Sequence, residues 1–115
     1  NLESYVNLLY NSKFTLLPRG SSVGLSYRLI EAMSAGSIPV IISDNFVLPF
    51  SDMINYNKFS ISIKENSIKN IEKKLKKIKN LDELHNNLII IYNIYFSTIE
   101  KIISTALVIF EMKQI

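Results

Sequence analysis

A chain of 115 residues is long enough for one domain, or for one part of a larger protein. Its hydrophobic fraction of 48% supplies a core and excludes a disordered segment. The absence of cysteine excludes disulfides and thiolate metal sites. The net charge of +3 comes from one lysine-rich segment without aromatic residues, so we expect no nucleic-acid partner.

The first half of the chain predicts two strands separated by a helix. Apolar spacing predicts a helix over residues 2–10, and a short apolar run predicts a buried strand over residues 14–17. A loop of glycine and serine follows at residues 18–25. The next helix is predicted over residues 26–35, because the glycine after it is the residue preferred just past a helix end. The apolar run at residues 38–42 predicts a second strand, which completes a parallel βαβ unit.

The second half predicts one more strand and two helices. Residues 43–57 form a long irregular connection, and alternating apolar and polar residues predict a strand over residues 59–63. A lysine-rich helix is expected over residues 67–79. The last helix is expected over residues 82–113, and residues 96–97 mark a point where it can break. Its continuous apolar stripe comprises Leu84, Leu88, Ile91, Tyr95, Ile99, Ile102, Ala106 and Ile109.

The order of these elements, α-β-α-β-β-α-α, predicts an α/β layered domain with a Rossmann-like parallel sheet and flanking helices. Residues 86–99 are uncharged and apolar but too few to span a bilayer, so we expect a buried helix there. In such sheets ligands bind at the carboxyl ends of the strands, where loops lead into helices. The loop at residues 18–25 occupies such a place.

The chain uses arginine at only two of its thirteen basic positions, Arg19 and Arg28. Its Asn- and Ile-rich composition indicates AT-rich coding, which favours lysine wherever a plain charge suffices. Arginine instead offers a planar fork that binds phosphate or carboxylate through two hydrogen bonds. Arg19 follows the first strand, and Arg28 is expected in the first helical turn, where it opposes the helix dipole unless an anion lies nearby. We therefore expect a phosphorylated ligand here.

The loop between the two arginines has the residues that an anion site requires. Gly20 and Gly24 allow the backbone to bend and a ligand to approach closely. Ser21, Ser22 and Ser26 supply hydroxyl groups that donate hydrogen bonds or cap the helix. The helix N-terminus adds unpaired N–H groups and the positive end of its dipole. Together these features predict a phosphate site.

Less specific interpretations of the same residues stay open. A glycine–serine loop can be an ordinary turn, and Arg28 and Glu31 have the spacing of a helical salt bridge. Neither a GxGxxG nor a Walker sequence is present. A P-loop NTPase and a GxGxxG dinucleotide enzyme are therefore disfavoured.

The other polar residues have structural explanations. His85 is the one histidine, and a metal site needs more ligands in a tighter arrangement. Asp44 and Asp52 lie in the irregular connection, where each is either a turn or cap residue or a ligand contact. The lysine-rich helix presents either a solvated face or a surface for an anionic partner. Its lysines are Lys69, Lys73, Lys74, Lys76, Lys77 and Lys79.

Four phrases in this order carry a family resemblance. They are residues 11–20 (NSKFTLLPRG), 28–41 (RLIEAMSAGSIPVI), 48–54 (LPFSDMI) and 95–102 (YFSTIEKI). The chain resembles the exostosin family of glycosyltransferases over nearly its whole length, in the half that binds the nucleotide sugar. The last phrase is most similar to the animal branch that polymerises heparan sulfate.

The resemblance implies that the chain is a single domain, residues 1–115, and forms the C-terminal lobe of a two-lobed (GT-B type) glycosyltransferase. In that family the lobe binds a UDP-sugar for inverting hexosyl or glucuronosyl transfer. By that match Arg19 and Arg28 hold the diphosphate and act in catalysis, and Glu31 binds the nucleoside or ribose hydroxyls. Neither a metal ion nor another cofactor is expected in the lobe. The other residues expected to contact the donor are Gly20, Ser21, Ser22 and Ser26.

The resemblance also implies a larger protein at the lumenal side of the Golgi or endoplasmic reticulum membrane. The chain does not begin with Met, and we expect it to be a piece of that protein, without its membrane anchor. The glycan acceptor and the general base would lie largely in an N-terminal lobe, so this chain alone is expected to be inactive. Homo- or hetero-dimers are expected. Two alternatives stay open: a non-catalytic exostosin-like partner subunit, and an unrelated small α/β anion-binding module.

Overall fold

A parallel three-stranded sheet lies at the centre of the molecule. The computed structural model describes residues 13–18, 22–44 and 47–114, and of residues 22–26 it describes the backbone alone. The strands are β1 (Phe14–Pro18), β2 (Ile38–Ile42) and β3 (Ile61–Ile63), in the order β1-β2-β3. The predicted βαβ unit and Rossmann-like α/β arrangement are confirmed. The helix predicted at residues 2–10 lies outside the described part.

Pro39 explains why β3 is shorter than predicted. The Ile38 N–H donates to the Lys13 carbonyl at 2.8 Å, so the nitrogen of the next residue, Pro39, faces the β3 side of the strand. Proline has no N–H to donate there. β3 accordingly begins at Ile61, opposite Val40. The paired residues of β2 are those that follow Pro39, namely Val40, Ile41 and Ile42.

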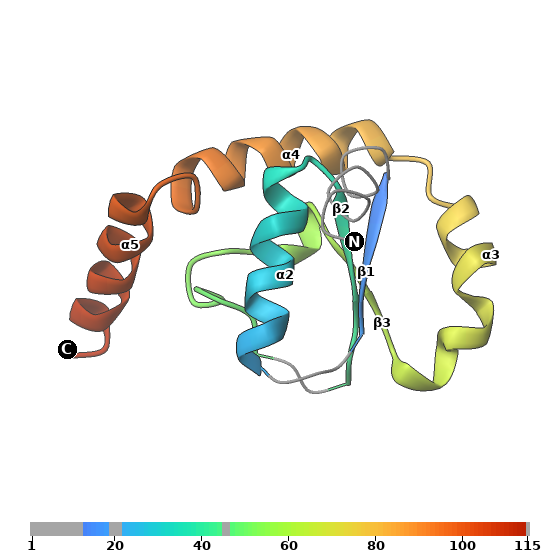
Figure 1. Ribbon diagram of the computed structural model, residues 1–115, viewed down its shortest axis with the longest axis horizontal. Helices are drawn as coiled ribbons and strands as arrows, with labels where there is room; N and C mark the ends of the chain where they lie inside the picture. The colour runs from blue at the N-terminus through green and yellow to red at the C-terminus, as the bar shows by residue number, and fades with distance from the viewer. Residues whose placement is uncertain (1–12, 19–21, 45–46, 115) are drawn as a thin grey trace, which may run out of the picture.

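Helices cover both faces of the sheet (Figure 1). Helix α2 (Ser22–Ser34) lies on one face, and α3 (Ile71–Lys76), which follows the 3₁₀ segment η2 (Glu65–Asn70), lies on the other. We call these the α2 face and the α3 face. Helix α4 (Leu81–Tyr95) runs past the edge of the sheet where β1 and β2 begin.

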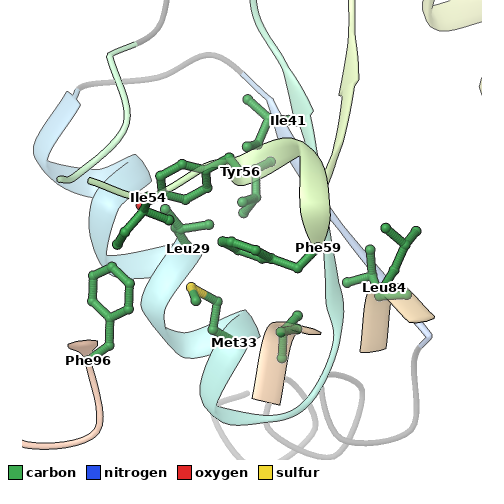
Figure 2. Close-up of a cluster of buried hydrophobic side chains, with 11 residues drawn as sticks. Leu29, Met33, Ile41, Ile54, Tyr56, Phe59, Leu84 and Phe96 are labelled. Carbon is green, nitrogen blue, oxygen red and sulfur yellow. The ribbon is translucent and has the colours of Figure 1, made fainter. Parts of the chain in front are cut away.

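The main core lies on the α2 face. Phe59 is fully buried, and Figure 2 shows its ring directed toward Leu29 and Met33 of α2. It follows the 3₁₀ segment η1 (Tyr56–Lys58), whose Tyr56 ring lies 5.1 Å from its own, centroid to centroid. The buried members of this cluster are Leu17, Leu29, Met33, Ile38, Ile41, Ile54, Tyr56, Phe59, Leu84, Leu88 and Phe96.

The α3 face has a much smaller core. Three buried strand residues form it, and half-buried Ile71 and Leu75 of α3 pack against them. The predicted lysine helix over residues 67–79 is correspondingly short, with six residues of α-helix after the 3₁₀ segment. Lysines at i and i+4 repel one another, which disfavours a longer regular helix. The buried strand residues are Val40, Ile42 and Ile63.

The predicted break in the C-terminal helix is confirmed. Helix α4 ends at Tyr95, and α5 (Ile99–Met112) begins after Thr98, whose hydroxyl oxygen accepts a hydrogen bond from the Lys101 N–H. The two helices meet at 84°. The predicted continuous stripe is wrong, because this bend leaves Ile99 72% exposed and Ala106 exposed as well.

The prediction of a buried helix at residues 86–99 is also wrong. Leu88 is buried, but Ile90 and Ile94 on the other side of α4 are exposed. In the described part of the chain, no single helix is long and apolar enough to cross a membrane. Helices α4 and α5 together have that length and apolar composition, but they form a bent pair.

Candidate functional site

The candidate site lies at the carboxyl edge of the sheet. The three strands are parallel, so β1, β2 and β3 all end at this edge, at Pro18, Ile42 and Ile63. Helix α2 begins there, four residues after β1 ends. This is where ligands bind in open α/β sheets. The three predicted site residues between β1 and α2, Arg19, Gly20 and Ser21, lie outside the described residues.

Helix α2 begins earlier than the sequence predicted. Its first residue is Ser22 rather than Ser26, so Gly24 lies within the helix and not in the loop. Arg28 is then the seventh helical residue, and its predicted place in the first turn is wrong. A glycine in a helix costs about 1 kcal/mol. The burial of the α2 residues Leu29 and Met33 against the sheet offsets this cost.

Arg28 and Glu31 lie together on the solvent side of α2. Leu29 and Ala32 are fully buried on the opposite side, which fixes the rotation of the helix. Both charged residues are exposed, and residues three apart on a helix are neighbours. The salt bridge that their spacing left open as an alternative is not formed: both residues belong to the described part, and no ion pair joins them. A guanidinium and a carboxylate are thus presented side by side to solvent.

The structure describes the backbone, but not the side chains, of the two predicted site serines in α2. Ser22 and Ser26 both belong to the helix, but their side chains lie outside the described part. Ser34, which ends the helix, donates its hydroxyl hydrogen bond to the Glu31 carbonyl at 2.8 Å. Of the residues predicted to contact a donor, Arg28 and Glu31 are therefore the two whose side chains the structure describes.

The two aspartates of the long connection have structural partners. The Asp44 carboxylate accepts a hydrogen bond from the Glu65 N–H at 3.1 Å, which fits the predicted cap role and ties the start of η2 to the end of β2. Asp52 lies in a turn, and its carboxylate is 3.4 Å from the Lys113 ammonium group beyond the end of α5. The sequence did not indicate this long-range pair.

The connection also holds a strained residue that the sequence did not reveal. Phe50 has a φ of 57°, a left-handed conformation that bulky side chains rarely adopt. Its ring stacks on Phe96 at a centroid distance of 5.7 Å. The neighbouring Pro49 carbonyl accepts a 2.6 Å hydrogen bond from the Tyr56 hydroxyl, and burial raises the pKa of that hydroxyl. These contacts hold the strained turn in place.

The described residues do not bring metal ligands together. Among them, no group of three or more His, Asp or Glu side chains could hold a metal ion. His85 is exposed on α4, the helix at the edge of the sheet where β1 and β2 begin. The charged side chains at this edge that the structure describes include Asp44 and Glu65, which follow β2 and β3, whereas Arg28 and Glu31 lie farther along α2.

Comparison with known proteins extends over nearly the whole chain. The family model described as the Exostosin GT47 domain matches residues 1–78. Exostosin-1 of Bos taurus is 34% identical over 109 residues, which cover 93% of this chain and 14% of that protein. The Exostosin-1 homolog of Caenorhabditis elegans is 37% identical over 103 residues, covering 85% of this chain and 26% of the relative. The chain thus spans about a seventh to a quarter of the length of these relatives.

Proposed function

The chain belongs to the exostosin family, and from that membership we propose that it is the lobe of a glycosyltransferase that binds a UDP-sugar. The observation that carries the proposal is the exposed placement of Arg28 and Glu31 on α2, where no ion pair among the described residues joins them; the helix starts at the carboxyl edge of a parallel sheet. The remainder of the two-lobed (GT-B type) enzyme would lie elsewhere in the longer protein.

The order of groups along α2 matches the order of groups in a nucleotide sugar. A helix rises about 1.5 Å per residue, so Arg28 lies about 9 Å from the start of α2 and Glu31 about 13 Å. Helical side chains lean toward the N-terminus, which brings the Arg28 guanidinium back toward the first turns. A diphosphate at the helix start would meet Arg28, and a ribose farther along the helix would meet Glu31. Two ribose hydroxyls can donate to one carboxylate.

The proposed role of the arginines is to stabilise the leaving group. In an inverting transfer the acceptor oxygen bonds to the anomeric carbon as the bond from that carbon to UDP breaks. The electron pair leaves with UDP, and a base outside this chain takes the acceptor proton. Negative charge grows on the β-phosphate, where Arg19 and Arg28 would stabilise it. By analogy with the loss of one oxyanion-hole donor in acyl transfer, removing one of these arginines should slow the reaction by about 10²–10³-fold.

The wider assignment follows the same family membership. We propose that the whole protein extends a heparan-sulfate-type glycan and resides at the lumenal side of the Golgi or endoplasmic reticulum membrane. Its acceptor site and base would lie in the partner lobe. The sugar transferred is a hexose or a glucuronate.

Isothermal titration of UDP into the full-length protein tests the donor site. We expect saturable binding by the wild-type protein. Arg28→Ala should weaken it by roughly tenfold or more, since hydrogen bonds to charged groups contribute about 1.5–3 kcal/mol. Arg28→Lys should recover little of the loss if the planar fork is required. No UDP binding at millimolar concentration by the folded protein would refute the proposal.

Glu31→Gln tests the nucleoside contact separately. It should weaken UDP binding while leaving inorganic pyrophosphate binding unchanged, because pyrophosphate has no ribose. Glu83→Gln is a matched control, since Glu83 is also an exposed helical glutamate but lies in α4, away from the carboxyl edge. Equal effects of the two substitutions would reject a specific role for Glu31. UDP binding without sugar transfer would favour a non-catalytic partner subunit.

A further inference from the structure

The lysines after β3 form a second charged surface, on the opposite side of the sheet from α2. We define the lysine face as Lys69, Lys73, Lys76 and Lys77, which are all exposed. Lys73, Lys76 and Lys77 are three and four residues apart in α3 and its C-terminal cap, which places them on one side of the helix, and Lys69 precedes them in η2. The half-buried apolar residues of α3 pack against the sheet, so the lysine face is directed to solvent.

Charge is separated along the chain. Residues 64–79 contain seven lysines and two glutamates, whereas the whole chain has a net charge of +3. The rest of the chain therefore has a net charge of −2. A surface that served solubility alone would intersperse both signs. This concentration of positive charge creates a local field that attracts anions.

The lysine face is electrostatically unfavourable for the protein alone. Lys73 has lysine neighbours at i+3 and i+4, and like charges at these spacings destabilise a helix. Lys76 pairs with Glu72 at 3.0 Å, but both side chains are largely exposed. Within the described residues, no ion pair neutralises Lys73 or Lys77. An anionic partner would supply the missing counter-charge.

The position of η2 connects this surface to the candidate donor site. The hydrogen bond from the Glu65 N–H to Asp44 fixes the start of η2 beside the end of β2. This is the same edge of the sheet where α2 begins (Figure 1). From there, η2 and α3 extend away from the edge along the α3 face. A long ligand leaving the site could follow them.

We propose that the lysine face binds an acidic polysaccharide with carboxylates repeated along its length, namely the glycan that the enzyme extends. The proposal rests on the proposed function. Lysine ammonium groups are flexible point charges, which suit a chain whose carboxylates shift position as it grows. Residues 64–79 contain no aromatic side chain on which nucleic-acid bases would stack. Ile71 and Leu75 are packed against the sheet, which leaves Ile68 of η2, 52% exposed, as a lone apolar side chain in this segment and too little apolar surface for insertion into a membrane.

Fluorescence anisotropy with labelled hyaluronan oligosaccharides, a carboxylate-bearing probe, tests the proposal on the full-length protein. The double variant Lys73→Gln/Lys77→Gln removes two unpaired charges of the lysine face. Lys13→Gln/Lys58→Gln removes two exposed charges elsewhere and changes the net charge equally. We expect the first variant to lose about tenfold in affinity and the control less than about twofold. Binding by the wild-type protein should weaken steeply with added salt.

The outcomes separate this inference from the donor site. UDP affinity should be the same in both double variants, since α2 is untouched. Equal hyaluronan affinities of the two variants would overturn the proposal and leave the lysine face as a solvated surface. Tighter binding to single-stranded DNA or to phosphatidylserine vesicles than to hyaluronan would also overturn it. Hyaluronan binding that depends on Lys73 and Lys77 in a protein that does not bind UDP would support the lysine face and refute the donor site.

Discussion

The two faces of the sheet are packed to different depths, although the same central strand serves both. On the α2 face, side chains from β1, β2, α2, η1 and α4 form one large buried cluster. On the α3 face, three buried strand residues are covered by half-buried side chains, of which Ile71 and Leu75 come from a six-residue helix. Adjacent residues of β2 show the division, since Ile41 belongs to the first cluster and Ile42 to the second.

This difference matches what each face presents to solvent. Recognition of a diphosphate and a ribose needs groups held in fixed positions, which rigid elements provide. Helix α2 is long and deeply packed, and it holds Arg28 and Glu31. Attraction of a flexible polyanion needs charge density but little positional accuracy. The shallowly packed α3 holds lysines.

The largest effect is expected from Phe59→Ala. Phe59 is 0% exposed at the centre of the α2-face cluster, and truncating a buried phenylalanine costs about 3–5 kcal/mol. Phe110→Ala on α5 is the matched control, because Phe110 is 61% exposed. We expect the control to change the free energy of unfolding by less than about 0.5 kcal/mol. Urea denaturation measures both, and equal losses would show that the deep core does not dominate stability.

The pair Ile41→Ala and Ile42→Ala tests the division directly. Both side chains are almost fully buried, so they differ mainly in which face they join. Isoleucine-to-alanine changes in cores cost about 2–5 kcal/mol, and the loss is smaller where the surroundings can collapse into the space. We expect Ile41→Ala near the upper limit and Ile42→Ala near the lower limit. Equal or reversed losses of unfolding free energy in urea denaturation would show that the α2 face is not packed more deeply than the α3 face.

Patterns local in sequence predicted most of the fold. The run at residues 38–42 coincides with β2, because a strand buried on both faces is continuously apolar. The break after Tyr95 was also predictable. The predicted burial of a continuous stripe along the last helix was wrong. The 84° angle between α4 and α5 depends on tertiary geometry and not on apolar spacing. Strand β3 was overextended, because the effect of Pro39 acts through a pairing distant in sequence.

The candidate site was less predictable than the fold. The position of the loop at a carboxyl strand end followed from the βαβ pattern. The start of α2 did not, because a glycine in the predicted loop tolerates helix and loop alike. That shift moved Arg28 out of the first turn. The strained Phe50 and the Asp52–Lys113 pair had no sequence signal, since both depend on contacts between distant segments.

A smaller effect is expected from Tyr56→Phe, at the rim of the α2-face cluster. Loss of the hydrogen bond to the Pro49 carbonyl should lower stability by about 1 kcal/mol at neutral pH. Because burial raises the pKa of the Tyr56 hydroxyl above its usual 10.0, the unfolded state loses this proton first as the pH rises. The stabilisation is therefore present below about pH 10 and is lost above it.

Urea denaturation of the wild type and of Tyr56→Phe between about pH 8 and 11 measures this contribution. The other tyrosines and the lysines titrate in both proteins, so their effect cancels in the difference. We expect the difference in unfolding free energy between wild type and Tyr56→Phe to narrow as the pH rises. A constant difference across that range would show that folding does not raise the pKa of the Tyr56 hydroxyl.

The smallest effect is expected where α5 meets the long connection. Asp52 and Lys113 lie 3.4 Å apart, but their side chains are 50% and 67% exposed. Exposed pairs contribute about 0–1 kcal/mol, so Asp52→Asn should lower stability by no more than about 0.5 kcal/mol.

Half-buried Ile102, which packs against the α2-face cluster, should hold α5 more strongly, and Ile102→Ala should cost clearly more. A double-mutant cycle of Asp52→Asn with Lys113→Gln measures the pair itself. If the coupling exceeds the loss from Ile102→Ala, α5 is held by charge and does not extend the packing of the α2 face.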